Sequence, residues 1–260
     1  MSETEGNETF TTADKITAGT KIKGQLASST DVDYFKYTTS GAASLNLSYD
    51  LPTSSNTDYF SVQILDSNNN ILSGVGTGKD GTLKASVTEA GTYYIGVSVD
   101  GYYHDSGQYG LTLNENAFTG DYESEPNHGS NSYGDVLTSN QKMSGQLYDS
   151  SDVDYYYIKA TQSGALSVNF DTPTDSNTDY FKVSLLDADF KVLSALDTGK
   201  DGEVTAAFDA AGTYWVKVQT SGYYHNDGVY GVTASLSTQT GTAETEGNET
   251  FTTADKITAG

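Results

Sequence analysis

Residues 91–99 read GTYYIGVSV, and the larger side chains of its second half stand at alternate positions. Tyr93, Ile95, Val97 and Val99 would share one face of an extended chain. The same alternation recurs in four further stretches, at 45–49, 60–64, 83–87 and 109–113. Half-buried strands that follow one another every 8 to 12 residues or so are typical of a β-sandwich or jelly roll. We predict an all-β fold of antiparallel β-sandwich (jelly-roll-like) domains, with about eight strands in each.

The chain contains two copies of one unit. GQL at 24–26 recurs at 145–147, an offset of 145 − 24 = 121 residues, and NTDYF at 56–60 recurs at 177–181 with the same offset. A second repeat is identical over 17 residues, because 3–19 and 244–260 read the same. Such periodicity indicates a segment of a tandem array. The predicted domains are 1–117 and 118–241, and 242–260 is predicted to begin a third repeat with its leader and first strand.

Composition excludes several classes of function. The chain has 35 acidic and 13 basic residues, all of the basic ones lysine, for a net charge of −22. Phosphate groups of nucleic acids and anionic membrane surfaces would be repelled. No apolar run is long enough to insert into a membrane, and the first residues lack a signal-peptide pattern. The absence of cysteine excludes disulfides and thiolate metal sites.

Two acidic clusters occur in each copy. The first is an E-x-E-x-N leader and the second is a D-x-D pair just before a predicted strand. Their members are Glu3, Glu5, Asn7, Asp31 and Asp33 in the first copy, and Glu123, Glu125, Asn127, Asp152 and Asp154 in the second. Calcium takes about six to eight oxygen ligands, which two such clusters could supply together. The alternative is a solvated acidic linker followed by a polar turn.

An ordered set of motifs resembles the bacterial pre-peptidase C-terminal domain. The set is the E-x-E-x-N leader, G-x-L, D-x-D-Y-F, and a late A-G-T-Y strand. In the first copy these are Glu3, Glu5, Asn7, Gly24, Leu26, Asp31, Asp33, Tyr34, Phe35 and the run 90–95. The second copy retains the order and spacing, although Tyr156 replaces the phenylalanine of D-Y-F.

The resemblance implies a jelly-roll β-sandwich of a secreted protein. In collagen-binding members of the family, calcium lies between the leader and the loop before the D-x-D-Y-F strand. Carried over to this chain, that implies Ca²⁺ held by the ten residues of the two clusters listed above. The third leader, at 244–260, has no Asp pair after it within this sequence.

No constellation of catalytic residues is evident. The three histidines are His104, His128 and His225, and the first and last are equivalent in the two copies. Neither copy combines a histidine with the partners that a triad or a zinc site would need. We therefore expect the protein not to be an enzyme.

A Gly-Tyr-Tyr-His loop precedes the last strand of each copy. Its candidate ligand-binding residues are Tyr102, Tyr103, His104, Tyr223, Tyr224 and His225. Exposed tyrosines offer a large contact area to a sugar or peptide at low entropy cost. The alternative is that the rings cover the open end of the sandwich.

These observations lead to one main hypothesis and two alternatives. The main one is a non-catalytic, calcium-binding tandem segment of a long, secreted bacterial surface or adhesin-type protein, with neighbouring repeats of the same chain as its partners. The first alternative is an accessory domain of a secreted protease that binds collagen-like peptide or glycan. The second is a subunit of a head-to-tail extracellular filament, in which 244–260 would pair with another chain.

Overall fold

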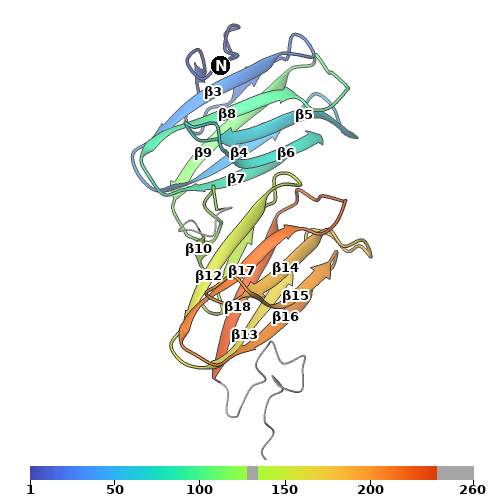
Figure 1. The fold of residues 1–260 in the computed structure, drawn as a ribbon. Helices are drawn as coiled ribbons and strands as arrows, with labels where there is room; N and C mark the ends of the chain where they lie inside the picture. Colours follow the sequence, from blue (N-terminus) through green and yellow to red (C-terminus); the bar gives the residue numbers. More distant parts are fainter. Residues whose placement is uncertain (128–133, 239–260) are drawn as a thin grey trace, which may run out of the picture. The chain divides into compact units, whose positions relative to one another are not determined.

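The computed structural model describes residues 1–127 and 134–238 (Figure 1). By its internal contacts the chain divides into two compact units, Met1–Pro126 and Asn127–Gly260. We call them the first and the second unit. The finer boundaries expected from the repeat, at 117/118 and 241/242, stay predictions, and the expected third repeat at 242–260 lies outside the described residues.

The first unit is a sandwich of two sheets. Its strands are β1 (Asp14–Lys15), β2 (Ile22–Gly24), β3 (Val32–Thr39), β4 (Ala43–Asp50), β5 (Ser55–Leu65), β6 (Ile71–Gly78), β7 (Gly81–Val87), β8 (Gly91–Val99) and β9 (Tyr109–Ala117). One sheet has the order β1-β3-β8-β5-β6 and the other β2-β9-β4-β7. Every connection between successive strands of the first unit except β5–β6 crosses from one sheet to the other, which is jelly-roll-like connectivity.

The alternation in the sequence sets which side chains enter the core of the first unit. On β4, Leu45, Leu47 and Tyr49 are buried, and on β8 Ile95 and Val97 are buried. They belong to one cluster to which both sheets contribute. Burying each large apolar side chain stabilises the fold by roughly 1.5–3 kcal/mol. The predicted β-sandwich is confirmed.

The second unit repeats this architecture. Its strands are β10 (Asp135–Val136), β11 (Lys142–Gly145), β12 (Val153–Ala160), β13 (Gly164–Asp171), β14 (Phe181–Leu186), β15 (Val192–Thr198), β16 (Gly202–Phe208), β17 (Gly212–Thr220) and β18 (Tyr230–Thr238). The sheet orders are β10-β12-β17-β14-β15 and β11-β18-β13-β16, which match the first unit strand for strand.

Each unit begins with a short strand that pairs in parallel with the strand carrying the D-x-D motif. Asp14 of β1 lies opposite Phe35 of β3, and Asp135 of β10 lies opposite Tyr156 of β12. All other strand pairs within the sheets are antiparallel. In the first unit, this pairing holds the chain that follows the leader against β3. Among the described residues, no helix has the length and apolar character needed to cross a membrane.

Candidate metal centre

The leader of the first unit is held by backbone hydrogen bonds at both of its ends. Glu3 N–H donates to Lys23 O at 2.9 Å, beside the first residues of β2. Further along, Asn7 O accepts from Tyr34 N–H at 3.0 Å, at the start of β3. Between them Gly6 has φ +100°, which glycine adopts without steric cost. Glu3, Glu5 and Asn7 stand at alternate positions, which favours an extended course, but the leader is not one uninterrupted extended segment, because the chain turns at Gly6.

The two aspartates of the D-x-D motif lie where the loop after β2 enters β3. Asp31 Oδ2 accepts from Ala27 N–H at 2.5 Å, which closes the loop on itself. Asp33 is the second residue of β3, and the pleat turns its side chain inward, where it is 0% exposed. A carboxylate on the inner face of a strand needs compensating partners, because charge is costly to bury.

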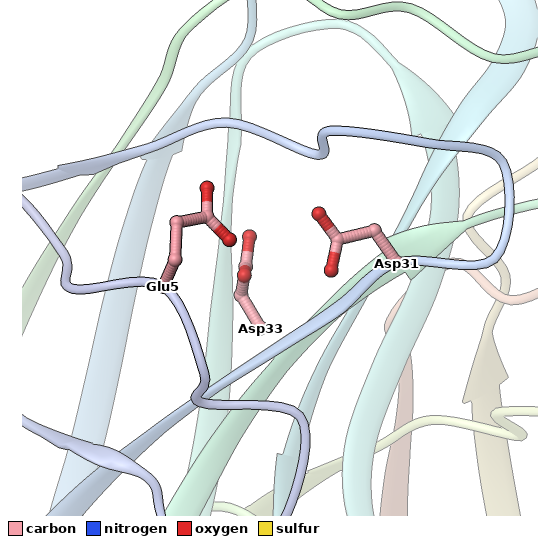
Figure 2. A group of neighbouring side chains, drawn as sticks. All are labelled: Glu5, Asp31 and Asp33. Atoms are coloured by element: carbon pink, nitrogen blue, oxygen red, sulfur yellow. The ribbon is translucent and has the colours of Figure 1, made fainter.

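Three carboxylates from these segments converge (Figure 2). Glu5 of the leader, Asp31 of the loop and Asp33 of β3 each offer an oxygen within 4.8 Å of the others. Figure 2 shows the Glu5 and Asp31 side chains pointing toward Asp33 from opposite sides. The leader and the D-x-D loop thus meet in space, as the calcium hypothesis requires.

Buried polar atoms without hydrogen-bond partners belong to the same two segments, the leader and the start of β3. Asp33 Oδ1 is one of them, and both side-chain polar atoms of Asn7 are others. Both residues are 0% exposed. A buried polar atom without a partner costs about 1–3 kcal/mol, and more if the group is charged. Native proteins rarely leave such atoms unmatched unless an ion or a water completes the site.

The electrostatics of Asp33 reflect the same shortage of partners. Burial raises the pKa of Asp33 from 3.8 to about 8, and the negative charges of Glu3 and Asp31 raise it further, against a lowering hydrogen bond from Tyr109. Burial also raises the pKa of Glu3. The protein alone therefore holds this cluster best with a proton in it, and a cation could take that proton's place.

Glu3 stands beside the group of three rather than in it. Its Oε1 accepts from Gln25 N–H at 2.6 Å, and its Oε2 lies 3.1 Å from the Tyr109 hydroxyl. The same hydroxyl donates to Asp33 Oδ2 at 2.6 Å. A phenol has a single proton, so Tyr109 cannot satisfy both carboxylates at once. Glu3 is therefore outside the group of three carboxylates and is linked to Asp33 through the hydroxyl of Tyr109.

The donor set fits a hard cation. Carboxylates from Glu5, Asp31 and Asp33, with the amide oxygen of Asn7 as a further candidate, are oxygen ligands of the kind that Ca²⁺ takes. Zinc sites in proteins rely on sulfur and nitrogen ligands, and this group contains neither histidine nor cysteine. The residues present therefore match calcium in chemistry.

The second unit holds its aspartates with equivalent contacts. Asn127 O accepts from Tyr155 N–H at 3.3 Å, and Asp152 Oδ2 accepts from Tyr148 N–H at 2.9 Å. Asp154 is 0% exposed and accepts from the Tyr230 hydroxyl. Glu123 and Glu125 precede Asn127, where the second unit begins, and their part in a second site stays a prediction.

The tyrosine loops lie between β8 and β9 and between β17 and β18. Tyr102 and Tyr223 are each 92% exposed, so these rings do not cover the core. His104 and His225 turn inward instead: their Nε2 atoms lie 3.0 and 2.8 Å from Leu26 O and Leu147 O. A carbonyl oxygen only accepts, so each Nε2 carries a proton and donates it. The histidines anchor the loops.

Tyr109, its counterpart Tyr230 and the glutamines after the G-x-L glycines did not emerge as site residues from the sequence. Tyr109 and Tyr230 look like ordinary core positions of a strand, and only the fold places their hydroxyls against Asp33 and Asp154. One signal could have found them: polar side chains that recur at the 121-residue offset, as Tyr109 and Tyr230 do and as Gln25 and Gln146 also do.

Comparisons with known proteins give fold-level likenesses only. No protein-family model and no curated protein matches the chain. Among solved structures, the pre-peptidase C-terminal domain of a collagenase from Bacillus anthracis matches with 20% identity and a TM-score of 0.32, covering 39% of this chain and 93% of that one.

Two other solved structures match over most of this chain. Tandem CBM51 modules of a family 98 glycoside hydrolase from Streptococcus pneumoniae are 9% identical with a TM-score of 0.29, covering 82% of this chain and 83% of that one. A putative secreted protein from Eubacterium rectale is 13% identical with a TM-score of 0.26, covering 90% and 84%. On its ordered motifs and its two sandwiches, the chain is a tandem pair of β-sandwich domains that resemble the pre-peptidase C-terminal domain.

Proposed function

We propose that the chain is a non-catalytic, calcium-binding tandem module of a secreted bacterial protein. In the first unit the ligands would be Glu5, Asp31, Asp33 and Asn7, with Glu3 positioning them. In the second copy the predicted ligands are Glu123, Glu125, Asn127, Asp152 and Asp154. Neighbouring repeats of the same chain would be its partners, in an extracellular or cell-surface array.

One observation carries this proposal: Asp33 is fully buried with Oδ1 unpaired, in the middle of two further carboxylates. A solvated acidic linker, the alternative reading of the clusters, would keep its charges in water. A buried carboxylate with a pKa raised to about 8 is the opposite case. A divalent cation would supply the missing partner and offset part of the charge of −22.

Calcium at this point would join the leader to the body of the domain. Asn7 and Glu5 belong to the leader, and Asp31 and Asp33 belong to the loop and strand that follow β2. An ion between them would resist separation of the leader from β3. In a tandem array the leader is also the segment that connects one domain to the one before it, so calcium binding would stiffen the array at each junction.

The histidines support a non-catalytic assignment. Both equivalent residues, His104 and His225, donate Nε2–H to backbone carbonyls, which removes that nitrogen from service as a base. We propose that their role is structural.

Calorimetric titration and thermal unfolding test the calcium proposal directly. Ca²⁺ at about 100 times its Kd should stabilise a domain that binds it by about 2.7 kcal/mol. For domains of this size the transition temperature should then rise by roughly 10 °C. A chelator should reverse the shift, and Mg²⁺, which demands a tighter octahedral shell, should reproduce little of it.

Asp33→Asn and Asp105→Asn form a matched pair of variants. Both remove one negative charge, but Asp105 lies in the tyrosine loop, where it accepts from Gly107 N–H at 2.7 Å. Asp33→Asn should remove one calcium from the stoichiometry, and Asp105→Asn should leave the stoichiometry unchanged. Equal effects of the two variants, or no heat of binding in the unaltered chain, would refute the proposal.

A second candidate function is ligand binding by the tyrosine loops, as in an accessory module that binds extracellular peptide or glycan. The specific observation in its favour is the exposure of Tyr102 and Tyr223, 92% each, together with Tyr103 at 56% and Tyr224 at 60%. Two large aromatic side chains exposed next to each other form a contiguous surface of the kind that marks interaction sites.

A further inference from the structure

The metal centre and the tyrosine loop of the first unit share one short piece of backbone. We call residues 25–27 the bridging segment and residues 100–108 the tyrosine loop. Gln25 N–H donates to Glu3, and Ala27 N–H donates to Asp31 Oδ2 at 2.5 Å, so both ends of the segment bond to the acidic cluster. Leu26 O lies between them and accepts from His104 Nε2 at 3.0 Å.

A second contact ties the same segment to the loop. The side chain of Gln25 donates Nε2–H to Ser106 O at 2.6 Å. His104 and Ser106 lie within three residues of Tyr103, so the bridging segment holds the base of the tyrosine loop on one side. Within the loop, Asp105 Oδ1 accepts from Gly107 N–H at 2.7 Å and keeps the turn closed.

The second unit reproduces this network with its own residues. Gln146 Nε2–H donates to Asp227 O at 2.6 Å, and His225 Nε2 lies 2.8 Å from Leu147 O. Tyr148 N–H donates to Asp152 at 2.9 Å. The bridging segment thus makes the same three hydrogen bonds in both units. The glutamine and the leucine bond to the tyrosine loop, and the residue after the leucine bonds to the first aspartate of the D-x-D motif.

The two tyrosines at the tip of each loop are arranged in the same way in both units. Tyr102 and Tyr103 meet edge to face, with centroids 5.6 Å apart and planes at 89°. Tyr223 and Tyr224 give the same distance and the same angle. Gly101 and Gly222 precede them with φ of +70° and +74°. Two perpendicular rings leave a corner that one face of each ring can line, and ring faces attract cations.

A carboxylate lies at the start of the tyrosine loop in each unit, although different strands provide it. In the first unit Asp100 covers the α-carbon of Gly76, so that a methyl group there would overlap the carboxylate. In the second unit the equivalents are exchanged: Asp197 stands at the position of Gly76, and Ser221, at that of Asp100, donates its hydroxyl to Asp197 at 2.6 Å. A carboxylate is thus placed at the start of the tyrosine loop in both units, although Asp197 also faces Lys182, with Nζ and Oδ2 3.9 Å apart.

We propose that each tyrosine loop binds a basic segment of a partner protein, through lysine or arginine side chains, and that calcium strengthens this binding through the bridging segment. The calcium part rests on the function proposed above. Charge complementarity selects the partner, since perpendicular tyrosines, a neighbouring carboxylate and a net charge of −22 all favour a cation. An ion held by Asp31, with Glu3 positioned beside the site, would fix Gln25–Ala27 through the hydrogen bonds of its two ends, and with it the base of the loop.

Fluorescence anisotropy of the whole chain with a labelled Lys-Gly-Ser peptide tests the proposal. Binding should tighten by about fivefold or more when calcium is added, in the usual range of coupling between sites. Non-specific attraction to an acidic protein predicts the opposite sign, because bound calcium lowers the negative charge. Peptides with serine or glutamate in place of lysine serve as controls and should not bind.

Two sets of variants separate the tyrosines from the coupling. Replacing all four tyrosines (Tyr102→Ser, Tyr103→Ser, Tyr223→Ser and Tyr224→Ser) should reduce peptide affinity at least fivefold and leave calcium binding unchanged. Gln25→Ala with Gln146→Ala should leave both ligands able to bind but remove most of the calcium effect on the peptide. A fold check by thermal unfolding accompanies each set.

The other possible outcomes distinguish failure of the calcium proposal from failure of the basic-partner inference. If calcium does not bind, the proposed function fails and the calcium coupling fails with it. If calcium binds but the peptide is insensitive to it or to the tyrosines, only the present inference is overturned. Retention of neutral glycans on an array, dependent on the four tyrosines, with no binding of the basic peptide, would assign the loops to sugar and overturn the basic partner.

Discussion

The two units treat the same buried aspartate differently. In the first, the Tyr109 hydroxyl donates to Asp33 and also faces Glu3, while Phe35 brings only a ring edge against Tyr109 at 6.5 Å. In the second, Tyr156 replaces that phenylalanine, and its hydroxyl lies 2.7 Å from the Tyr230 hydroxyl, which in turn donates to Asp154. The hydroxyl of Tyr156 thus adds a second hydrogen bond, to the Tyr230 hydroxyl that donates to Asp154.

This difference shows how a substitution outside the acidic cluster can tune it. A hydroxyl that accepts a hydrogen bond becomes a better donor, because chains of hydrogen bonds polarise one another. Tyr230 should therefore stabilise a charged Asp154 more than Tyr109 stabilises a charged Asp33. The first unit depends more on a proton or a cation to balance its cluster.

The units also cover the outer face of their five-stranded sheets with different aromatic residues. In the first, Phe10 from the leader region stacks on Tyr94 of β8 at 3.8 Å and 5°. In the second, Phe190 from the turn between β14 and β15 packs on Trp215 of β17 at 5.1 Å. The equivalent of Phe190 is Asn69, and both have positive φ, 61° and 67°. Asparagine tolerates that conformation, but phenylalanine does so at a cost that packing on Trp215 offsets.

We expect the largest loss of stability from a substitution that breaks the contact between Tyr109 and Asp33 in the first unit alone. Gly24→Ala would place a methyl group where the Tyr109 hydroxyl and the Glu3 carboxylate now lie. We expect a loss of about 3 kcal/mol in the unfolding free energy of the first unit, together with loss of its calcium site. Gly41→Ala is the matched control, because nothing lies within 4 Å of its added carbon. Denaturant unfolding that shows similar losses for both variants would contradict the assignment.

The next effect concerns pH and the charge on Asp33. Its pKa is raised to about 8 in the folded state, from 3.8. The folded protein thus holds the proton more tightly than the unfolded chain, and the resulting stability is present below about pH 4 and is lost as pH rises through about 8. Without metal we expect the first unit to lose roughly 1–2 kcal/mol of unfolding free energy across this window, because the charged form of Asp33 is buried.

Denaturant unfolding at several pH values, with chelator present, measures this loss as the difference between the unaltered chain and Asp33→Asn. Phe35→Tyr gives the first unit a second tyrosine hydroxyl next to Tyr109, as Tyr156 has next to Tyr230 in the second unit. This variant should narrow the pH range over which stability is lost. A flat difference between pH 4 and 8 would show that Asp33 is paired already. Calcium affinity should fall as pH drops below about 8, since the ion must displace the proton.

A smaller effect is expected from Tyr156→Phe, which gives the second unit the arrangement of the first. It removes a hydroxyl from a buried chain and should cost about 1 kcal/mol in unfolding free energy. The second unit should then become more dependent on calcium for its stability. Measurement with and without chelator separates the two contributions, and an unchanged calcium dependence would argue against the role given to Tyr156.

The smallest effect tests the aromatic cover of the second unit. Phe190→Asn relieves the backbone at positive φ but uncovers Trp215, and we expect a net loss of about 0.5–1 kcal/mol. Trp215 is the single tryptophan of the chain, so its emission should shift to longer wavelength. The reciprocal Asn69→Phe should destabilise the first unit, where Phe10 already covers Tyr94. A stabilising Asn69→Phe would show that the turn itself favours phenylalanine.

Most of the fold could be predicted from particular patterns. The alternation of Tyr93, Ile95, Val97 and Val99 indicated β8, although only Ile95 and Val97 are fully buried. The 121-residue offset predicted that the second unit would repeat the first, as its sheet order confirms. The predicted ligands Glu5, Asp31 and Asp33 do converge. The alternate spacing of Glu3, Glu5 and Asn7 favours an extended leader, but Gly6 turns the chain between them.

The strands and the repeat could be recognised from the order of the residues, because alternation and periodicity can be read along the chain without knowledge of its packing. The sequence also supplied the charges, whose residue types are those that calcium prefers. Which of these charges are buried depends on how the two sheets pack. Asp33 loses its solvent because β3 and β9 belong to the two different sheets of the sandwich, and β9 brings Tyr109 to it from 76 positions away in the chain. Sequence spacing carries no record of such a contact, and desolvation, which raises the pKa of Asp33, exists only once the sheets have packed.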